Sequence, residues 1–155
     1  MKFSGPLIAV SDIEVSKKFY QDVMHQKIVL DFGINVTFDG HFSLQADFAE
    51  LVGFNKNELI PGSKSFELYF EEENLDQFVQ HLKTHPAIKY VHDVKEYPWG
   101  QRVIRFYDPD QHMVEVGESM EKVVQRFLTQ GLSVEETATR TMFPIEFVRN
   151  CQQPN

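Results

Sequence analysis

The chain has 155 residues and a mass of 18.1 kDa, which suits a single domain with a substantial core. Its 15 Lys and Arg residues against 23 Asp and Glu residues give a formal net charge of −8, which argues against general binding to nucleic acid or to an anionic membrane surface. The single cysteine, Cys151, excludes an internal disulfide and a zinc site built from cysteines.

Hydrophobic residues make up 42% and charged residues 25% of the chain, a composition typical of a globular protein. No apolar stretch approaches the roughly 20 residues that a membrane-spanning helix needs. The N-terminal segment MKFSGPLIAV lacks the pattern of a signal peptide. We therefore expect a cytoplasmic protein.

The first part of the chain is predicted to form a strand, a helix and three further strands. Residues 3–10 are apolar and short, as in a buried strand. Ser11 and Glu14 match a capping box, and an apolar stripe that includes Phe19 follows, so we expect a helix over 12–24. Three β-like segments come next, with the hairpin signal Asp-Gly before the last of them: 27–32, 34–38 and 42–48.

The same order returns after a loop at 49–63. Residues 64–71 alternate like a half-buried strand, and Asn74 can cap a helix whose apolar stripe runs to Leu82. Three more strands are predicted at 88–96, 101–107 and 112–116. Asn74 lies 63 residues after Ser11, so the two halves align. The sequence therefore predicts two consecutive βαβββ units, which together form an α+β architecture.

The segment after Gly117 predicts three small helices. Ser119 can cap the first, Ser133 and Glu136 form a capping box for the second, and Pro144 fits the first turn of the third. Its charges balance: Lys122, Arg126, Arg140 and Arg149 against Glu121, Glu135, Glu136 and Glu146. Without a basic stripe, a DNA-binding role is not expected. We expect this tail to pack on the sheet, to dimerise, or to cover a cleft.

Alternation along the predicted strands separates an apolar face from a polar one. The polar face carries Ser43, Gln45, Glu67, Tyr69 and Glu115, and Met113 shares the parity of Glu115. If the sheet curls, these groups converge inside a cleft. If it stays open they face water, which parity alone favours.

The sequence from Trp99 to Val116, WGQRVIRFYDPDQHMVEV, resembles the closing hairpin of the vicinal oxygen chelate superfamily. This superfamily includes glyoxalases, bleomycin-resistance proteins, fosfomycin-modifying enzymes and extradiol dioxygenases. Residues 7–20 are similar to the opening of its first module, and the resemblance extends over about 3–117. In the turn, Gln111 replaces the usual glycine, at a cost on the order of 1 kcal/mol if the backbone is left-handed there.

The resemblance implies two βαβββ modules, at about 3–48 and 64–117, that form a curled mixed sheet around a cleft. It therefore divides the chain into a glyoxalase/bleomycin-resistance-like domain at 1–118 and a C-terminal helical extension at 119–155. Because family members are commonly dimers, a homodimer is expected.

Metal enzymes of this superfamily hold a divalent cation with His or Glu side chains from four strands. The resemblance places these ligand positions on Gly5, Gln45 (or Ser43), Glu67 and Glu115 in this chain. Glycine has no side chain, and none of the histidines occupies a family ligand position, although His41 could substitute. Two carboxylates and one amide are a poor zinc or nickel site, since such metals prefer imidazole, whereas Mg²⁺ and Mn²⁺ accept oxygen ligands.

Several other residues are candidates for the site. Glu67 and Glu115 could serve as a general acid and base, and an internal arginine such as Arg102 could satisfy them instead. Contacts to a ligand are expected from Tyr69, Trp99, Arg102, Gln45 and Met113.

The first hypothesis is a protein that binds a small organic molecule, aromatic or cationic, in the cleft without an intact family metal site. The alternative is a lyase, isomerase or dioxygenase of the same superfamily that depends on a divalent metal (Mg, Mn, Fe, Ni or Zn). A third reading is a ligand-sensing regulator that presents the helical tail to a partner protein.

Overall fold

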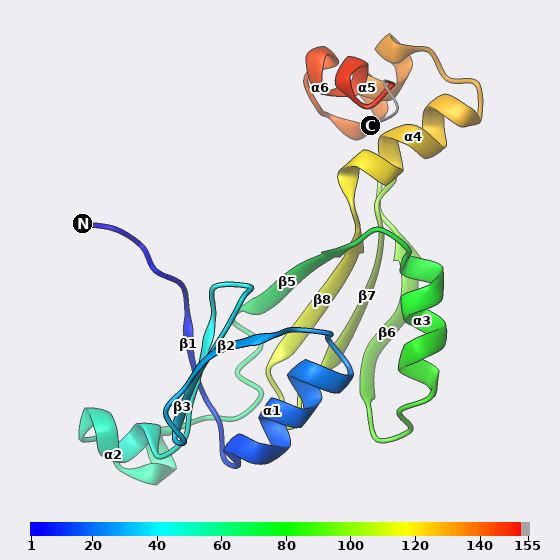
Figure 1. Cartoon of the computed structure of the whole chain (residues 1–155). Coiled ribbons are helices and arrows are strands. Elements are labelled where there is room, and N and C mark those ends of the chain that lie inside the picture. The colour runs from blue at the N-terminus through cyan, green and yellow to red at the C-terminus, as the bar shows by residue number, and fades with distance from the viewer. Residues whose placement is uncertain (153–155) are drawn as a thin grey trace. The chain divides into compact units, whose positions relative to one another are not determined.

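The computed structural model describes residues 1–152 and contains the order β-α-β-β-β twice (Figure 1). The first copy comprises β1 (Leu7–Ala9), α1 (Ile13–Asp22), β2 (Ile28–Asp31), β3 (Asn35–Phe38) and β4 (Ser43–Gln45). The second comprises β5 (Glu67–Glu72), α3 (Leu75–Lys83), β6 (Lys89–Glu96), β7 (Arg102–Tyr107) and β8 (Met113–Glu118). The α+β class and the doubled order are thus confirmed.

Further helices connect and follow these two copies. A helix, α2 (Phe48–Val52), begins at the last residue of the strand predicted at 42–48 and continues into the stretch expected to be a loop, which also contains a short 3-10 helix, η1 (Lys56–Glu58). The predicted three-helix tail is present as α4 (Met120–Thr129), α5 (Val134–Thr141) and α6 (Ile145–Asn150).

Contacts between Cα atoms divide the chain into two compact units. The first unit holds the first β-α-β-β-β copy together with two later segments, His85–Lys89 and Tyr107–Met113. The second unit holds the rest of the second copy and the C-terminal helices.

Both sheets are four-stranded and use the same strand order, β1-β4-β3-β2 in one and β5-β8-β7-β6 in the other. In the first sheet β1 and β4 are parallel, while β3 is antiparallel to both β2 and β4. The register pairs Asn35 with Gln45 and Thr37 with Ser43. These pairs bring polar side chains side by side on one face.

Each sheet is covered on one face by the helix of its own copy. In the first, the fully buried Tyr20 of α1 packs against Phe38 and Phe42, with ring centroids 5.7 and 5.0 Å apart. In the second, Phe78 of α3 packs against Phe106 of β7 at 6.4 Å. Since side chains alternate along a strand, the polar side chains occupy the opposite faces.

The start of α1 differs from the prediction. Asp12, not Ser11, is the N-cap, because its Oδ1 accepts hydrogen bonds from the amides of Glu14 (3.0 Å) and Val15 (3.1 Å). The Ser11 amide donates to Asp110 Oδ1 instead (2.9 Å). The capping box predicted there is therefore wrong, and both α1 and β1 are shorter than the sequence pattern indicated.

The capping box predicted for the second tail helix is confirmed. The Glu136 amide donates to Ser133 Oγ (3.1 Å), and Glu136 Oε2 accepts from the Ser133 amide (2.8 Å). Ser119 likewise caps α4. An apolar cluster joins these helices to the hairpin between β6 and β7: Met120, Val123 and Phe127 with Trp99, Leu132, Phe143 and Phe147. At Gly100, where φ is +86°, the ring of Phe127 occupies the place of a side chain, so the hairpin and α4 approach closely.

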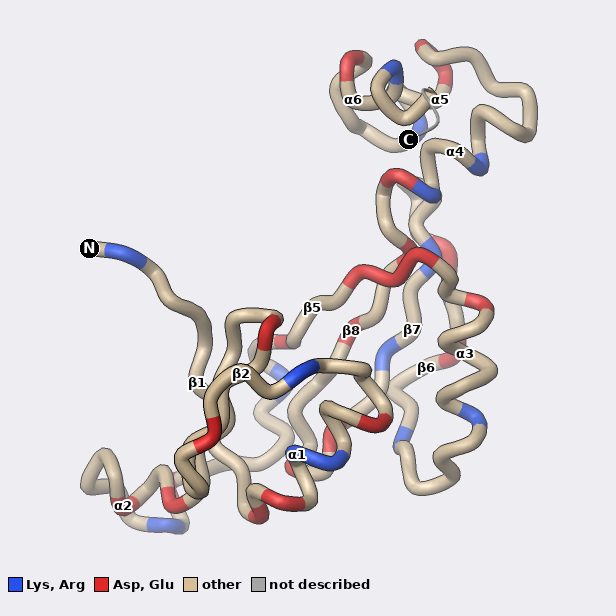
Figure 2. The backbone as a smooth tube through the Cα atoms, in the orientation of Figure 1, with Lys and Arg blue, Asp and Glu red and all other residues tan. Residues whose placement is uncertain are grey.

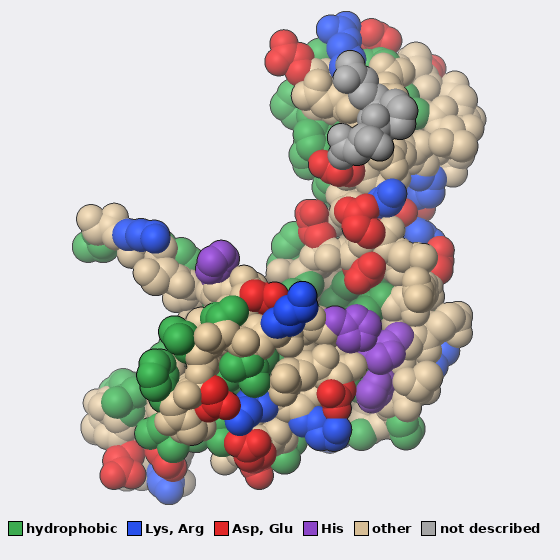
Figure 3. Space-filling model, in the orientation of Figure 1, with side chains coloured by type: hydrophobic (Ala, Val, Ile, Leu, Met, Phe, Trp, Pro, Cys, Tyr) green, Lys and Arg blue, Asp and Glu red, His purple; other side chains and the backbone are tan. Residues whose placement is uncertain are grey.

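The surface mixes both signs of charge, with an acidic run at Glu71–Glu73 where β5 ends (Figure 2). Apolar side chains are also exposed over the first unit (Figure 3). Four of them follow the edge strand β2 and the turn after it: Val29, Leu30, Phe32 and Ile34. Within residues 1–152, no helix has the length and hydrophobicity that crossing a membrane requires.

Candidate functional site

The face of the first sheet that α1 leaves uncovered carries Asn35, Thr37, Ser43 and Gln45, and we call it the first open face. Cross-strand partners satisfy one another here: Thr37 Oγ1 and Ser43 Oγ lie 2.8 Å apart, and Asn35 Nδ2 donates to Gln45 Oε1 (2.9 Å). Gln45 Nε2 donates to the Ala46 carbonyl (2.7 Å), and Gln45 is only 5% exposed. The first open face is therefore neutral, with its amides already engaged.

The corresponding face of the second sheet carries Tyr69, Glu71, Arg105 and Glu115, and we call it the second open face. Its centre is an ion pair between Arg105 Nη2 and Glu115 Oε2. Glu115 is 7% exposed, and its Oε2 accepts no further hydrogen bond, so Arg105 is the group that compensates this buried charge. Such a partner compensates the charge of the buried carboxylate and fixes its position.

Two aromatic residues fix the position of Arg105. Its Nη1 donates to Tyr97 Oη, and its guanidinium carbon lies 5.4 Å from the centre of the Tyr97 ring. The same Nη1 lies 3.3 Å from His92 Nε2. His92 Nδ1 is 2.7 Å from the Asp93 carbonyl, which places the proton on Nδ1 and leaves Nε2 as an acceptor. Arg105 is thus oriented from β6 as well as from β8.

A chain of hydrogen bonds runs along the other side of this face. Trp99 Nε1 donates to Gln101 Oε1 (3.1 Å), and Gln101 Nε2 donates to Tyr69 Oη (2.8 Å). Tyr69 Oη in turn donates to Glu71 Oε1 (2.9 Å). A side chain at Gly117 would collide with Gln101 and crowd the Tyr69 ring, so the glycine permits this contact.

Tyr69 combines a fixed hydroxyl with an accessible ring. Desolvation is the largest influence on it, and together with Glu71 it raises the pKa of Tyr69 to about 12, although the bond from Gln101 opposes this. The hydroxyl therefore stays protonated and continues to donate to Glu71 at neutral pH. The residue remains 47% exposed. Tyr69 can offer an aromatic surface to a ligand without moving.

Trp99 and Arg102 both form their contacts with other residues of the second unit. The Trp99 ring stacks on Tyr97 (centroids 4.8 Å apart) and packs against the apolar cluster of the tail. Arg102 binds Glu118 through Nε (3.2 Å) and Nη2 (3.1 Å), and it binds Asp76 of α3 through Nη1. The arginine that pairs with Glu115 is therefore Arg105, not Arg102.

The remaining predicted site residues lie in the first unit. Glu67 is exposed at the start of β5, and Met113 is half-buried at the start of β8. Because Glu67 belongs to the first unit and Glu115 to the second, their convergence stays a prediction.

Three of the four positions that the resemblance assigns to metal ligands lack a free donor side chain. Gly5 precedes β1, has a φ of +116°, and would bring any Cβ into the His41 carbonyl oxygen, so no ligand can stand there without a backbone change. Gln45 Oε1 already accepts a hydrogen bond from Asn35, and the charge of Glu115 is compensated by the ion pair with Arg105. Within neither unit do three His, Cys, Asp or Glu side chains of residues 1–152 gather as metal ligands.

The sequence analysis missed Arg105 and His92, and it did not predict that Tyr97 contacts Arg105. The signal for Arg105 was available: alternation along 102–107 places it opposite the buried Ile104 and Phe106, on the face that Glu115 shares on the neighbouring strand. No periodic signal points to Tyr97 or His92, because their contacts with Arg105 depend on how the β6–β7 hairpin folds back.

A second polar centre lies in the first unit, at the turn between β7 and β8. The buried Asp108 accepts from Tyr20 Oη (2.9 Å) and from the amide of His112 (2.8 Å), and lies 2.9 Å from His112 Nδ1. Asp110 accepts from Ser16 Oγ (3.1 Å). Burial and the neighbouring Asp108 raise the pKa of Tyr20 well above its ordinary value. The acidic residues of the motif thus fasten the turn to α1.

Comparison with known proteins gives consistent results. The model of the glyoxalase-like domain family matches residues 3–121. A protein of unknown function from Agrobacterium tumefaciens is 38% identical, with a TM-score of 0.70 over 77% of this chain and 94% of that one. A glyoxalase/bleomycin resistance protein/dioxygenase family enzyme from Burkholderia phytofirmans is 19% identical (TM-score 0.64, 74% of this chain and 96% of that one). A glyoxalase-related enzyme from Fulvimarina pelagi is 16% identical (TM-score 0.63, 77% and 89%), so these two share the fold alone.

Proposed function

Since the chain belongs to the glyoxalase-like domain family, we propose that it binds a small planar organic molecule on the second open face, without a metal ion at the family position. The observation that carries the proposal is the ion pair between Arg105 and Glu115. It puts a guanidinium beside Glu115, a residue to which the resemblance assigns a metal-ligand position, so this carboxylate already has a counter-charge.

The ion pair also narrows the ligand class. The charge of Glu115 is compensated by Arg105, so it attracts a cationic ligand only weakly. The charge of Arg105 is compensated by Glu115, so it attracts an anionic ligand only weakly. A planar molecule without net charge, with a carbonyl or amide group, can contact both partners without separating them. The exposed Tyr69, on β5 next to the strand that carries Glu115, offers an aromatic surface for stacking.

The fluorescence of Trp99 provides a direct test, because it is the only tryptophan in the chain and it borders this face. Three probes of matched size differ in charge: naphthalene carboxamide, naphthoate and N-methylquinolinium. We expect the neutral carboxamide to bind the wild-type protein most tightly. In Arg105→Met the carboxylate loses its partner, so N-methylquinolinium should gain about tenfold in affinity, which corresponds to about 1.4 kcal/mol.

Matched variants separate recognition from misfolding. The double variant Arg105→Met/Glu115→Met removes both charges. It should still bind the carboxamide and should prefer neither naphthoate nor N-methylquinolinium. Lys83→Gln, on α3, removes a charge elsewhere and should leave all three affinities unchanged. The proposal is wrong if charge preference is the same in the wild type and in Arg105→Met. It is also wrong if the purified protein holds a stoichiometric divalent ion that Glu115→Ala releases, since that outcome supports a metal-dependent lyase, isomerase or dioxygenase.

A further inference from the structure

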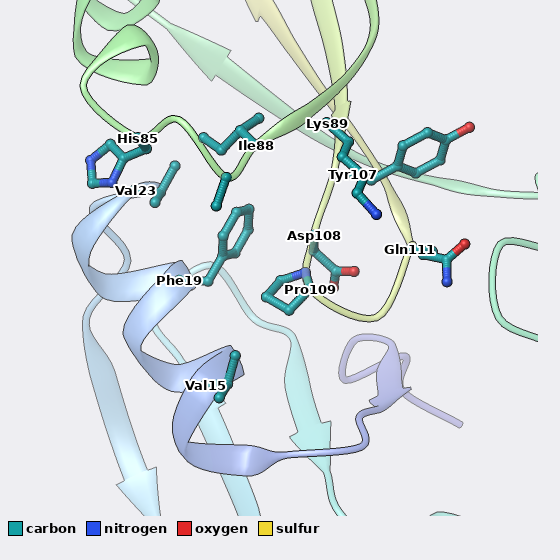
Figure 4. A pocket seen from close by; sticks show the side chains of 11 residues that line it. Val15, Phe19, Val23, His85, Ile88, Lys89, Tyr107, Asp108, Pro109 and Gln111 are labelled. Atoms are coloured by element: carbon teal, nitrogen blue, oxygen red, sulfur yellow. The ribbon is translucent and has the colours of Figure 1, made fainter.

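The first unit contains a cavity of about 340 Å³ on the side of α1 that faces two later segments of the chain (Figure 4). One wall consists of Val15, Phe19 and Val23, which lie on one stripe of α1. Ala87 and Ile88, after α3, and Pro109, in the β7–β8 turn, add further apolar surface. A volume of this size is within the range that small-molecule sites occupy, roughly 300–1,000 Å³.

Three polar side chains of the cavity lie apart from this apolar wall, whereas His85 is on the α1 side, near Val23 in Figure 4. Figure 4 shows the ends of Lys89, Tyr107 and Gln111 on the side opposite the α1 side chains. The cavity is therefore amphipathic: a ligand that fills it needs an apolar body and a polar head.

The available charge at the polar side is positive. Asp108 lines the cavity, but its carboxylate is buried. The carboxylate already accepts hydrogen bonds from Tyr20 Oη and from two backbone amides, so it offers a ligand no free acceptor. The Lys89 side chain forms no ion pair or hydrogen bond with any other residue of 1–152. An ammonium without a partner, across the cavity from an apolar wall, is complementary to the anionic head group of an amphiphile.

We propose that this cavity binds a small amphiphilic carboxylate, with its apolar body between α1 and Ile88 and its carboxylate at Lys89. This site shares no residue with the second open face, because every residue that lines the cavity belongs to the first unit.

Calorimetric titration with octanoate tests the proposal directly. If the apolar body is buried, each methylene group contributes about fourfold in affinity, so hexanoate should bind about fifteenfold more weakly than octanoate. If the head group contacts Lys89, octanoate should bind more tightly than octanol or octyltrimethylammonium. In Lys89→Met, octanoate should lose about tenfold in affinity while octanol stays unchanged.

Two pairs of variants locate the site. Val15→Asp places a carboxylate in the apolar wall and should abolish octanoate binding. Val15 is 51% exposed and lies in the first turn of α1, where an acidic residue is favourable, so the variant should fold. Val29→Asp, at a similarly exposed position on β2, is its control, and Lys95→Met, on the same strand as Lys89, is the control for the charge.

The outcomes distinguish this site from the proposed function. Arg105→Met should leave octanoate binding intact, since Arg105 lies in the second unit. The proposal is overturned if octanoate does not bind, if octyltrimethylammonium binds equally well, or if Val15→Asp has no effect. It is also overturned if Val15→Asp changes only the oligomeric state, because the cavity would then be a contact between copies of the chain.

Discussion

The two open faces share one topology and differ in chemistry. On the first, hydroxyl and amide side chains pair across β3 and β4, at 2.8 Å for Thr37 and Ser43 and at 2.9 Å for Asn35 and Gln45. On the second, the equivalent strands β7 and β8 carry Arg105 and Glu115. Strand order alone therefore does not determine what a face can recognise. The side chains at the matched positions do.

The difference should also determine how much stability each face loses when a mutation removes one partner of a pair. A neutral hydrogen bond contributes about 1 kcal/mol to stability, and water can replace part of it. A buried charge that loses its partner costs far more, about 3–5 kcal/mol, because it cannot be rehydrated where it lies. The second open face should thus be the more sensitive of the two.

Arg105→Met should show this with the largest effect. The variant leaves Glu115, 7% exposed, without its counter-charge, so we expect the free energy of unfolding to fall by about 3 kcal/mol in urea titrations. Asn35→Ala breaks the matched neutral pair on the first open face and should cost about 1 kcal/mol. The double variant Arg105→Met/Glu115→Met should recover most of the loss. Equal losses in Arg105→Met and Asn35→Ala would contradict the distinction between the faces.

A second comparison concerns two tyrosines that donate to carboxylates. Tyr20 is fully buried and donates to Asp108 at 2.9 Å, whereas Tyr69 is 47% exposed and donates to Glu71 at the same distance. Tyr20→Phe should lower the free energy of unfolding by about 2 kcal/mol, since a hydrogen bond to a buried charge is the stronger kind. Tyr69→Phe should cost less than 1 kcal/mol, by order of magnitude, because water can solvate Glu71. Similar values for the two variants would show that burial does not set the difference.

The sequence alone was sufficient to predict the doubled order and the family. Helical stripes and strand alternation located each main element, and the Asp-Pro-Asp-Gln-His turn carried a resemblance that the family match confirms. Boundaries were less accurate at the start of the chain. Asp12 and Ser11 are both good caps, and the choice between them depends on Asp110, which lies far away in the sequence.

The candidate site could be predicted only in part. Parity placed Tyr69, Gln45 and Glu115 on the polar faces, but it does not say which arginine reaches a given carboxylate. Arg102 and Arg105 are three residues apart and so point to opposite faces of β7. Deciding between them requires knowing that α3 covers the Arg102 side, a tertiary fact that periodicity does not contain.

The turn between β7 and β8 should also make stability depend on pH. Burial lowers the pKa of His112, but the hydrogen bond and charge of Asp108 outweigh it, so the pKa lies above the ordinary 6.5. A group with a raised pKa in the folded state stabilises the fold fully below its unfolded pKa and loses that contribution as the pH rises through the folded pKa. The wild type should therefore lose stability as the pH rises above 6.5. The effect should be smaller than that of Tyr20→Phe, because burial opposes it.

His112→Gln tests this assignment. It should flatten the decline in the free energy of unfolding across that pH range, whereas His41→Gln, at an exposed position in the first unit, should retain it. If both variants decline like the wild type, the pH dependence comes from another group. The measurement is a series of urea titrations at fixed ionic strength.

The smallest expected effect compares a backbone feature that both hairpins share. Gln111 has a φ of +67° in the β7–β8 turn and His41 a φ of +59° after the β3–β4 turn, so each hairpin holds a side chain in the left-handed region. A left-handed residue other than glycine costs about 1–2 kcal/mol, and glycine costs about 0.5–1 kcal/mol in chain entropy. Gln111→Gly and His41→Gly should therefore each raise the free energy of unfolding by about 0.5 kcal/mol. Gln125→Gly, inside α4, should instead lower it by about 1 kcal/mol, so a loss in all three variants would mean that side-chain contacts, not backbone strain, decide stability in these turns.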